Sequence, residues 1–188
     1  MVAEYKHILV GVDGSRQAKR ALDKAIAVAL RNQAELIIVT IMSGGDYVGL
    51  GNNTQVGFGY VDQQVMDESR QALEALVDQY RQKAQEAGVE RVVTSVFYGH
   101  AKVDLAKSLP KEYQADLIML GATGVNVVER MLLGSTASYV VANAVCDVLV
   151  VRTDLHNQVT RLKKFQLNKG YQGSSWRLPE LFFCCLYF

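Results

Sequence analysis

The sequence lacks any marked excess of charge. Its 20 basic and 19 acidic side chains leave a formal charge of +1 over 188 residues. A charge this close to zero gives no electrostatic reason to expect nucleic acid or an anionic membrane as a partner. Cysteine is also scarce: Cys146, Cys184 and Cys185 are spaced neither as a disulfide framework nor as a zinc site. We therefore expect a protein of a reducing compartment.

Long apolar runs are missing as well. No stretch reaches the roughly 18 apolar residues that a membrane span requires. At the start, MVAEYKHILV places charges and a histidine before a short apolar run that ends at Gly11, which is too short for the core of a signal peptide. These features predict a cytoplasmic location without membrane association.

Both standard nucleotide signatures are absent. The chain contains no G-x-x-x-x-G-K-[ST], and no G-x-G-x-x-G follows its first apolar run. A P-loop enzyme and a typical dinucleotide-binding domain are thereby excluded.

Short apolar runs alternate regularly with helical patterns. The run HILVGV, from His7 to Val12, is short and continuous, as expected of a strand that is buried on both faces. The predicted strands are residues 7–12, 35–42, 91–99, 116–120 and the run DVLVVR from Asp147 to Arg152. Five strands joined by four crossover helices predict a parallel, doubly wound α/β domain.

The four helices are predicted from apolar positions at helical spacing. The first is capped by Ser15 and carries Ala18, Ala21, Leu22, Ala25, Ile26, Ala29 and Leu30 on one side. The second follows a cap at Asp62, has a stripe of Val65, Ser69, Ala72, Leu73, Leu76, Tyr80 and Ala84, and ends at Gly88. The third covers residues 101–111 with Val103, Ala106 and Leu109 inward, and the fourth covers 135–144.

Two segments interrupt this alternation. Residues 43–60 hold six glycines without periodicity, which predicts a long loop that is either functional or disordered. Residues 154–188 carry five basic and two acidic residues and seven of the 16 aromatic residues, again without a clear period. We expect one domain over residues 1–153. The tail is either a poorly ordered appendage or an aromatic peptide that docks on the domain or on a partner.

Glycines cluster where predicted strands end. In open α/β sheets, ligands bind at the carboxyl ends of the strands, where the winding direction reverses. The stretch GATGVNVVERMLLGS places Gly121 and Gly124 after the fourth strand and the pair Gly134–Ser135 at a helix start, whose free N–H groups suit an anion. Two interpretations are open: the glycines only make tight turns, or they cradle a polyphosphate.

The pattern Gly121-x2-Gly124-x9-Gly134-Ser135 resembles the ATP-binding subgroup of the universal stress protein family. The resemblance extends to HILVGVDGS, YGHAKVDLAK, ADLIMLGATG and LLGSTASYVVANAVCDVLVVR, and so accounts for most of residues 1–153. It implies a Rossmann-like sheet with strand order 3-2-1-4-5. The sequence departs from the family habit at Val125 and Asn126, and at Asp147, where proline is common.

The resemblance also implies a role for each matching residue. Asp13 would contact the ribose, while Gly11 and Val12 would lie beside the adenine and Ile41 against it. Gly121 and Gly124 would surround the ribose and phosphates, and Gly134, Ser135 and Thr136 would form the phosphate-binding helix start. Mg²⁺ would be carried by the phosphates, since no carboxylate cage is evident in the sequence.

These expectations lead to a principal hypothesis and two rivals. The principal hypothesis is an ATP-binding sensor or regulatory module, which hydrolyses ATP slowly if at all because it lacks a P-loop lysine, a base for water and an arginine finger. We expect bound ATP to order residues 43–60. The family resemblance further implies a homodimer through the last strand. The rivals are a partner-binding stress module without nucleotide and an adenylylating enzyme.

Overall fold

The computed structural model describes residues 4–42, 63–124 and 133–157, with the side chains of residues 63–66 excepted. Several predictions fall elsewhere and so lie outside the described residues. They concern the loop at 43–60, the cap at Asp62, the departures at Val125 and Asn126, and the tail beyond residue 157.

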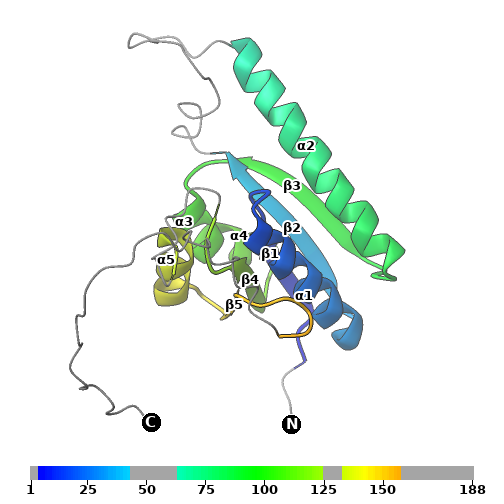
Figure 1. Ribbon diagram of the computed structural model, residues 1–188. Coiled ribbons are helices and arrows are strands. Elements are labelled where there is room, and N and C mark those ends of the chain that lie inside the picture. Colours follow the sequence, from blue (N-terminus) through cyan, green and yellow to red (C-terminus); the bar gives the residue numbers. More distant parts are fainter. Residues whose placement is uncertain (1–3, 43–62, 125–132, 158–188) are drawn as a thin grey trace, which may run out of the picture.

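Within the described residues, five strands form one parallel sheet in the order β3-β2-β1-β4-β5 (Figure 1). The strands are β1 (His7–Gly11), β2 (Glu35–Met42), β3 (Val92–Tyr98), β4 (Leu117–Gly121) and β5 (Asp147–Val151). The central strand pairs on both sides, so that Gly11 lies opposite Val39 of β2 and Leu120 of β4. This topology confirms the predicted doubly wound α/β fold.

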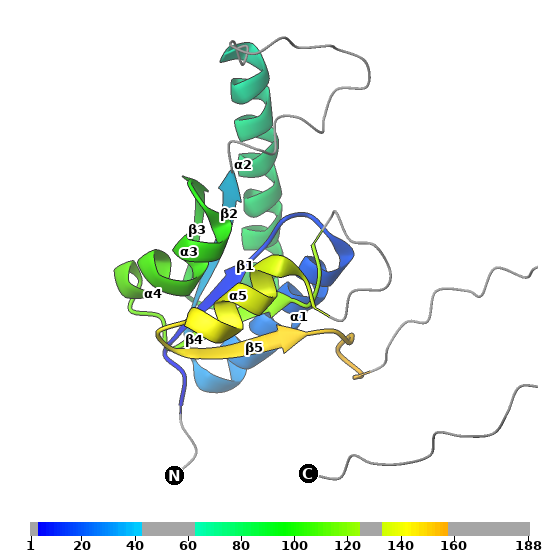
Figure 2. The ribbon, with the colours of Figure 1, turned by 90° about the vertical axis from the view of Figure 1, so that its left-hand side faces the viewer.

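Helices cover both faces of the sheet. They are α1 (Arg16–Asn32), α2 (Gln63–Glu86), α3 (Ala101–Val103), α4 (Leu109–Glu112) and α5 (Ser135–Asn143), with a π-helical turn, Asp104–Ser108, between α3 and α4. Figure 2 shows α3, α4 and α5 in front of the sheet and α1 and α2 behind it. Two buried clusters match these layers, because α1 and α2 pack on one face while Leu105, Leu109 and Val140 pack on the other.

The first helix begins as predicted. The Ser15 hydroxyl accepts the Ala18 N–H at 3.0 Å, and the apolar stripe from Ala18 to Ala29 is buried. The prediction was wrong for Leu30, whose side chain is 42% exposed. It lies in the last turn of α1, where the adjacent Ala29 is buried instead, and a Cβ on Gly88 would lie 3.6 Å from its Cδ2 atom.

The second helix is buried only in its later half. Val77, Tyr80 and Ala84 lie in the core, whereas Ala72, which the spacing placed on the inner stripe, is exposed. Figure 1 shows the reason: the early turns of α2 extend past the end of the sheet.

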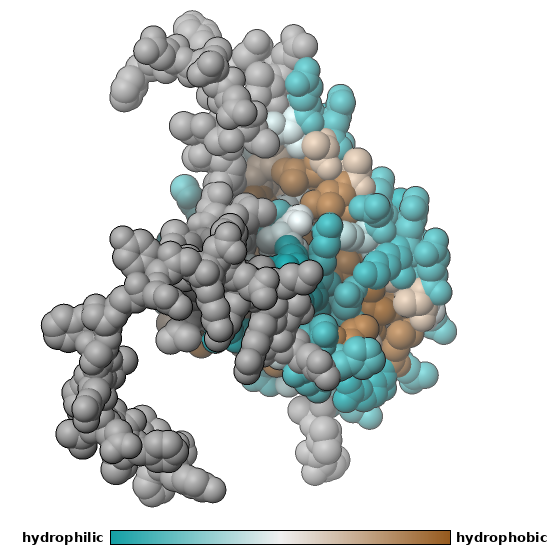
Figure 3. All heavy atoms as spheres, viewed as in Figure 1, coloured by the Kyte–Doolittle hydropathy of each residue, from teal (hydrophilic) through white to brown (hydrophobic). Residues whose placement is uncertain are grey.

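The surface seen from the viewpoint of Figure 1 is mixed in polarity, since Figure 3 shows hydrophilic residues with hydrophobic residues visible between them. Along the described chain, no helix is both long enough and apolar enough to cross a membrane.

The third crossover differs most from its prediction. Ala106 and Leu109 point inward as expected, but Val103 is 41% exposed and Leu105 is buried instead. The prediction assumed an α-helical period throughout, whereas the N–H of Leu109 bonds to the carbonyl of Asp104 in a π-helical turn. The wider turn changes the angle around the helix axis between the side chains before it and those after it.

Truncation of one leucine at a time tests this account of α1. Leu22 is fully buried and Leu30 is not, although both were predicted on the same stripe. We expect Leu22→Ala to lower the free energy of unfolding by about 2–5 kcal/mol, because it leaves a cavity. The matched control Leu30→Ala should cost less than about 1 kcal/mol. Urea denaturation measures both, and equal losses would contradict the burial pattern.

Candidate functional site

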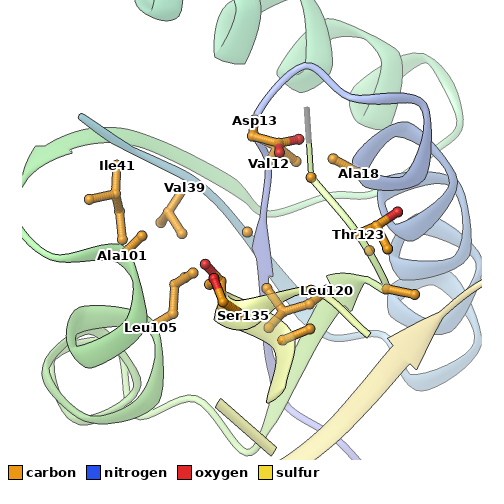
Figure 4. A pocket seen from close by; sticks show the side chains of 17 residues that line it. Val12, Asp13, Ala18, Val39, Ile41, Ala101, Leu105, Leu120, Thr123 and Ser135 are labelled. Carbon is orange, nitrogen blue, oxygen red and sulfur yellow. The ribbon is translucent and has the colours of Figure 1, made fainter. Parts of the chain in front are cut away.

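A pocket of about 410 Å³ opens at the carboxyl ends of the strands (Figure 4). It lies where the chain diverges, since β1 leads into α1 on one face while β4 leads toward α5 on the other. All nine residues that were predicted to hold a ligand line this pocket. They are Gly11, Val12, Asp13, Ile41, Gly121, Gly124, Gly134, Ser135 and Thr136.

The exit of β1 supplies the acidic side of the pocket. The Val12 N–H donates to the Val39 carbonyl at 2.8 Å, which carries the strand pairing one residue past β1. Asp13 then turns away from the sheet and remains exposed. Its Oδ1 accepts the Ser15 N–H at 2.9 Å, and this bond fixes the carboxylate above the start of α1.

The two glycines after β4 have different surroundings. A Cβ on Gly121 would lie 2.7 and 2.9 Å from backbone atoms of Gln17 and Ala18, so this glycine is required for close packing of β4 on α1. A Cβ on Gly124 would lie 2.5 Å from the Oδ2 of Asp13. Gly124 therefore lets the two loops approach each other, and it borders the open side of the pocket.

The start of α5 provides N–H donors that have no acceptor among the described residues. The Gly134 N–H donates to the Ala122 carbonyl at 2.7 Å, which holds the beginning of the helix against the exit of β4. Gly134 is the N-cap and contributes no side-chain cap. The first helical bond runs from the Ser138 N–H to the Gly134 carbonyl, so the N–H groups of the first turn are available to a ligand. With the positive end of the helix dipole, they favour an anion.

The opposite end of the pocket is apolar. Figure 4 shows Val39, Ile41, Ala101 and Leu105 gathered on one side, away from Asp13 and Thr123. Of this group only Ile41 was predicted. Ala101 could have been predicted from its place just after the carboxyl end of β3, and Leu105 from its spacing of four residues from Leu109. Ala122 and Thr123 also line the pocket, within the predicted loop from Gly121 to Gly124, and the lining residues that were not predicted include Ala18, Leu120 and Ala137.

The pocket carries little formal charge. Asp13 is the sole ionisable side chain among the described residues that line it. Its negative field reaches α2: burial first, and then the charges of Asp13 and Asp23, raise the pKa of the Tyr80 hydroxyl. Across the part of the chain that the structure describes, no three His, Cys, Asp or Glu residues are grouped to hold a metal ion. His100 is exposed beside α3 and does not line the pocket.

Comparisons with known proteins agree with this architecture. Residues 4–152 match the universal stress protein family. A universal stress protein homologue of Staphylococcus aureus is 40% identical over 174 residues, which cover 90% of this chain and 98% of the relative. One of Staphylococcus epidermidis is 40% identical over 150 residues, covering 80% and 86%.

Solved structures agree as well. The universal stress protein UspA of Lactobacillus plantarum is 32% identical with a TM-score of 0.66, covering 80% of this chain and 99% of that protein. A universal stress protein in complex with cAMP is 26% identical with a TM-score of 0.56, covering 79% and 98%. The match to the family extends over nearly the whole described α/β domain. This chain therefore belongs to the universal stress protein family.

Proposed function

We propose that this protein binds ATP together with Mg²⁺ in the cytoplasm and acts as a nucleotide-dependent sensor or regulatory module. The observation that carries the proposal is the polarity of the pocket. An apolar end, an acidic side chain and the open first turn of a helix line the same cavity of about 410 Å³. A base, a ribose and a phosphate chain call for these three kinds of surface.

Each part of the nucleotide has a matching surface. Val39 and Ile41 offer an apolar wall for the base, and the Asp13 carboxylate can accept hydrogen bonds from the ribose hydroxyl groups. The N–H groups of Ser135 and Thr136, with their hydroxyls, suit phosphate oxygens. The related universal stress protein in complex with cAMP supports an adenine nucleotide as the ligand of this fold.

The charge of the pocket supports a role for Mg²⁺. The described lining has one formal charge, which is negative, and ATP brings about four more negative charges. The dipole of α5 offsets only about half of one charge. A divalent ion on the phosphates would supply the missing positive charge without a dedicated protein cage.

Slow hydrolysis follows from the same set of lining side chains. A fast ATPase positions a base or a polar side chain on the attacking water and a cation on the leaving phosphate. Asp13 is the one described lining residue that can act as a base, and its carboxylate is engaged by the Ser15 N–H and lies against Gly124. We therefore assign this pocket to binding rather than to rapid turnover.

We further propose a homodimer through the outer edge of the sheet. The edge strand β5, the helix α5 and the loop between them expose Leu149, Val141 and Val145, which are 42%, 53% and 51% exposed. Among the described residues β5 pairs with β4 alone, and a second copy of the same strand would cover its outer edge.

Isothermal titration of Gly124→Val with Mg-ATP tests the proposed site. The new side chain must displace the Asp13 carboxylate and fill the phosphate approach, so we expect at least an approximately tenfold loss of affinity, about 1.4 kcal/mol. Ala142→Val, on the exposed side of α5, is the control and should bind as the wild type does. A wild type that gives no heat at high ATP concentration would refute the proposal and favour a partner-binding module without nucleotide.

Removal of the metal tests the part assigned to Mg²⁺. Titration with ATP in excess EDTA should give an affinity at least about tenfold below that of Mg-ATP, since the phosphates then face Asp13 without a counter-ion. AMP carries fewer negative charges than ATP, so its affinity should fall much less when Mg²⁺ is removed. Equal ATP affinities with and without Mg²⁺ would show that the protein itself neutralises the phosphates.

A charged residue on the sheet edge tests the dimer. We expect Leu149→Glu to shift the protein from dimer to monomer in light scattering after size-exclusion chromatography, because a buried carboxylate would be unpaired. Leu30→Glu is a matched control, since Leu30 is also 42% exposed but lies on α1. A wild type that runs as a monomer, or a dimer that survives Leu149→Glu, would contradict this interface.

A further inference from the structure

The helical segment between β3 and β4 departs from α-helical geometry where it passes the pocket. In the turn Asp104–Ser108, the Leu109 N–H donates to the Asp104 carbonyl, five residues back. Such π-helical turns are rare, and those that occur are frequent at functional sites. This one carries Leu105, which lines the pocket.

Pro110 lies two residues after this turn, at the start of α4. It has no backbone N–H and so cannot close the α-helical bond to the carbonyl of Ala106, four residues earlier. That carbonyl instead accepts the N–H of Val145, at 3.3 Å, from the loop between α5 and β5. One α-helical bond just after the π-helical turn is thus absent, and the Ala106 carbonyl has a partner outside the helix.

The turn and the residues just after it pack on the sheet. Two adjacent pairs, Leu105 with Ala106 and Leu109 with Pro110, are all buried. The two Cδ atoms of Leu105 lie 3.2 and 3.3 Å from the position that a Cβ on Gly11 would take. Leu105 therefore packs directly on the last residue of β1, at the apolar end of the pocket.

We propose that Pro110 is a positioning residue of the nucleotide site: it maintains the π-helical turn that holds Leu105 against Gly11, where Leu105 forms the wall for the base. This inference rests on the proposed function. An α-helix advances about 100° per residue, so a turn that is one residue shorter would rotate Leu105 relative to the buried Leu109. The phosphate end is built from the exit of β4 and the start of α5, and it would keep its geometry.

Two ligands distinguish an effect on the base end of the pocket from an effect on its phosphate end. Titrations of Pro110→Ala with Mg-ATP and with magnesium tripolyphosphate should show an approximately tenfold loss for ATP and a change of less than about twofold for tripolyphosphate. Lys111→Ala, at the next and exposed helical position, is the matched control and should change neither. Unchanged ATP affinity in Pro110→Ala, or an equal loss for both ligands, would overturn the proposal.

A measurement without nucleotide distinguishes failure of this inference from failure of the proposed function. The wild type should show a nuclear Overhauser effect between the Leu105 methyl groups and the Gly11 α-protons, and slow hydrogen exchange at the Val145 amide. Both should be lost in Pro110→Ala and kept in Lys111→Ala. Their persistence in Pro110→Ala refutes the positioning role, whereas a wild type that binds no ATP refutes the function. Should Pro110→Ala not fold, Leu105→Ala must give the same split between ATP and tripolyphosphate, and equal losses would overturn the inference.

Discussion

The divergence of the chain at the carboxyl ends of β1 and β4 is the constraint on which the rest of the structure depends. The two strands are hydrogen-bonded neighbours, yet their following helices cover opposite faces of the sheet. No helix can fill the space between the two exits, and a pocket results. The bond from the Gly134 N–H to the Ala122 carbonyl then holds the start of α5 at this opening. The N-terminus of α5 thereby faces the pocket and adds the positive end of a helix dipole to it.

The polarity of the pocket follows from which elements reach it. Loops from β1 and β4 meet where Gly124 lies against Asp13, and this contact forms the polar side. The apolar side comes from β2 and from the π-helical segment, which contributes Leu105. A flexible polyanion with a flat aromatic end fits such a gradient in one orientation. The same gradient leaves few groups for chemistry, since Asp13 is the one ionisable side chain in the described lining.

Much of this architecture could be predicted from the spacing of apolar residues in the sequence. Short continuous apolar runs indicated buried parallel strands, and the spacing after Ser15 indicated a capped amphipathic helix, which the structure confirms. The nine predicted site residues meet in one pocket, although their contacts with a nucleotide stay predictions. The errors have a common form. Ala72, Leu30 and Val103 have the right spacing for an inner stripe, but spacing does not report how far the packed part of a helix extends or which of two adjacent residues is covered.

The sequence by itself determined the strands, the helices and the edge of the sheet at which a ligand would bind, because these follow from residues a few positions apart. Tertiary structure decided what each position does there. It made Gly121 a packing requirement against α1 and placed Gly124 against Asp13, a difference that two similar glycines do not reveal. It also brought Leu105 to Gly11 from the π-helical turn between α3 and α4. Such contacts join residues distant in the chain, and only the packing of whole elements fixes them.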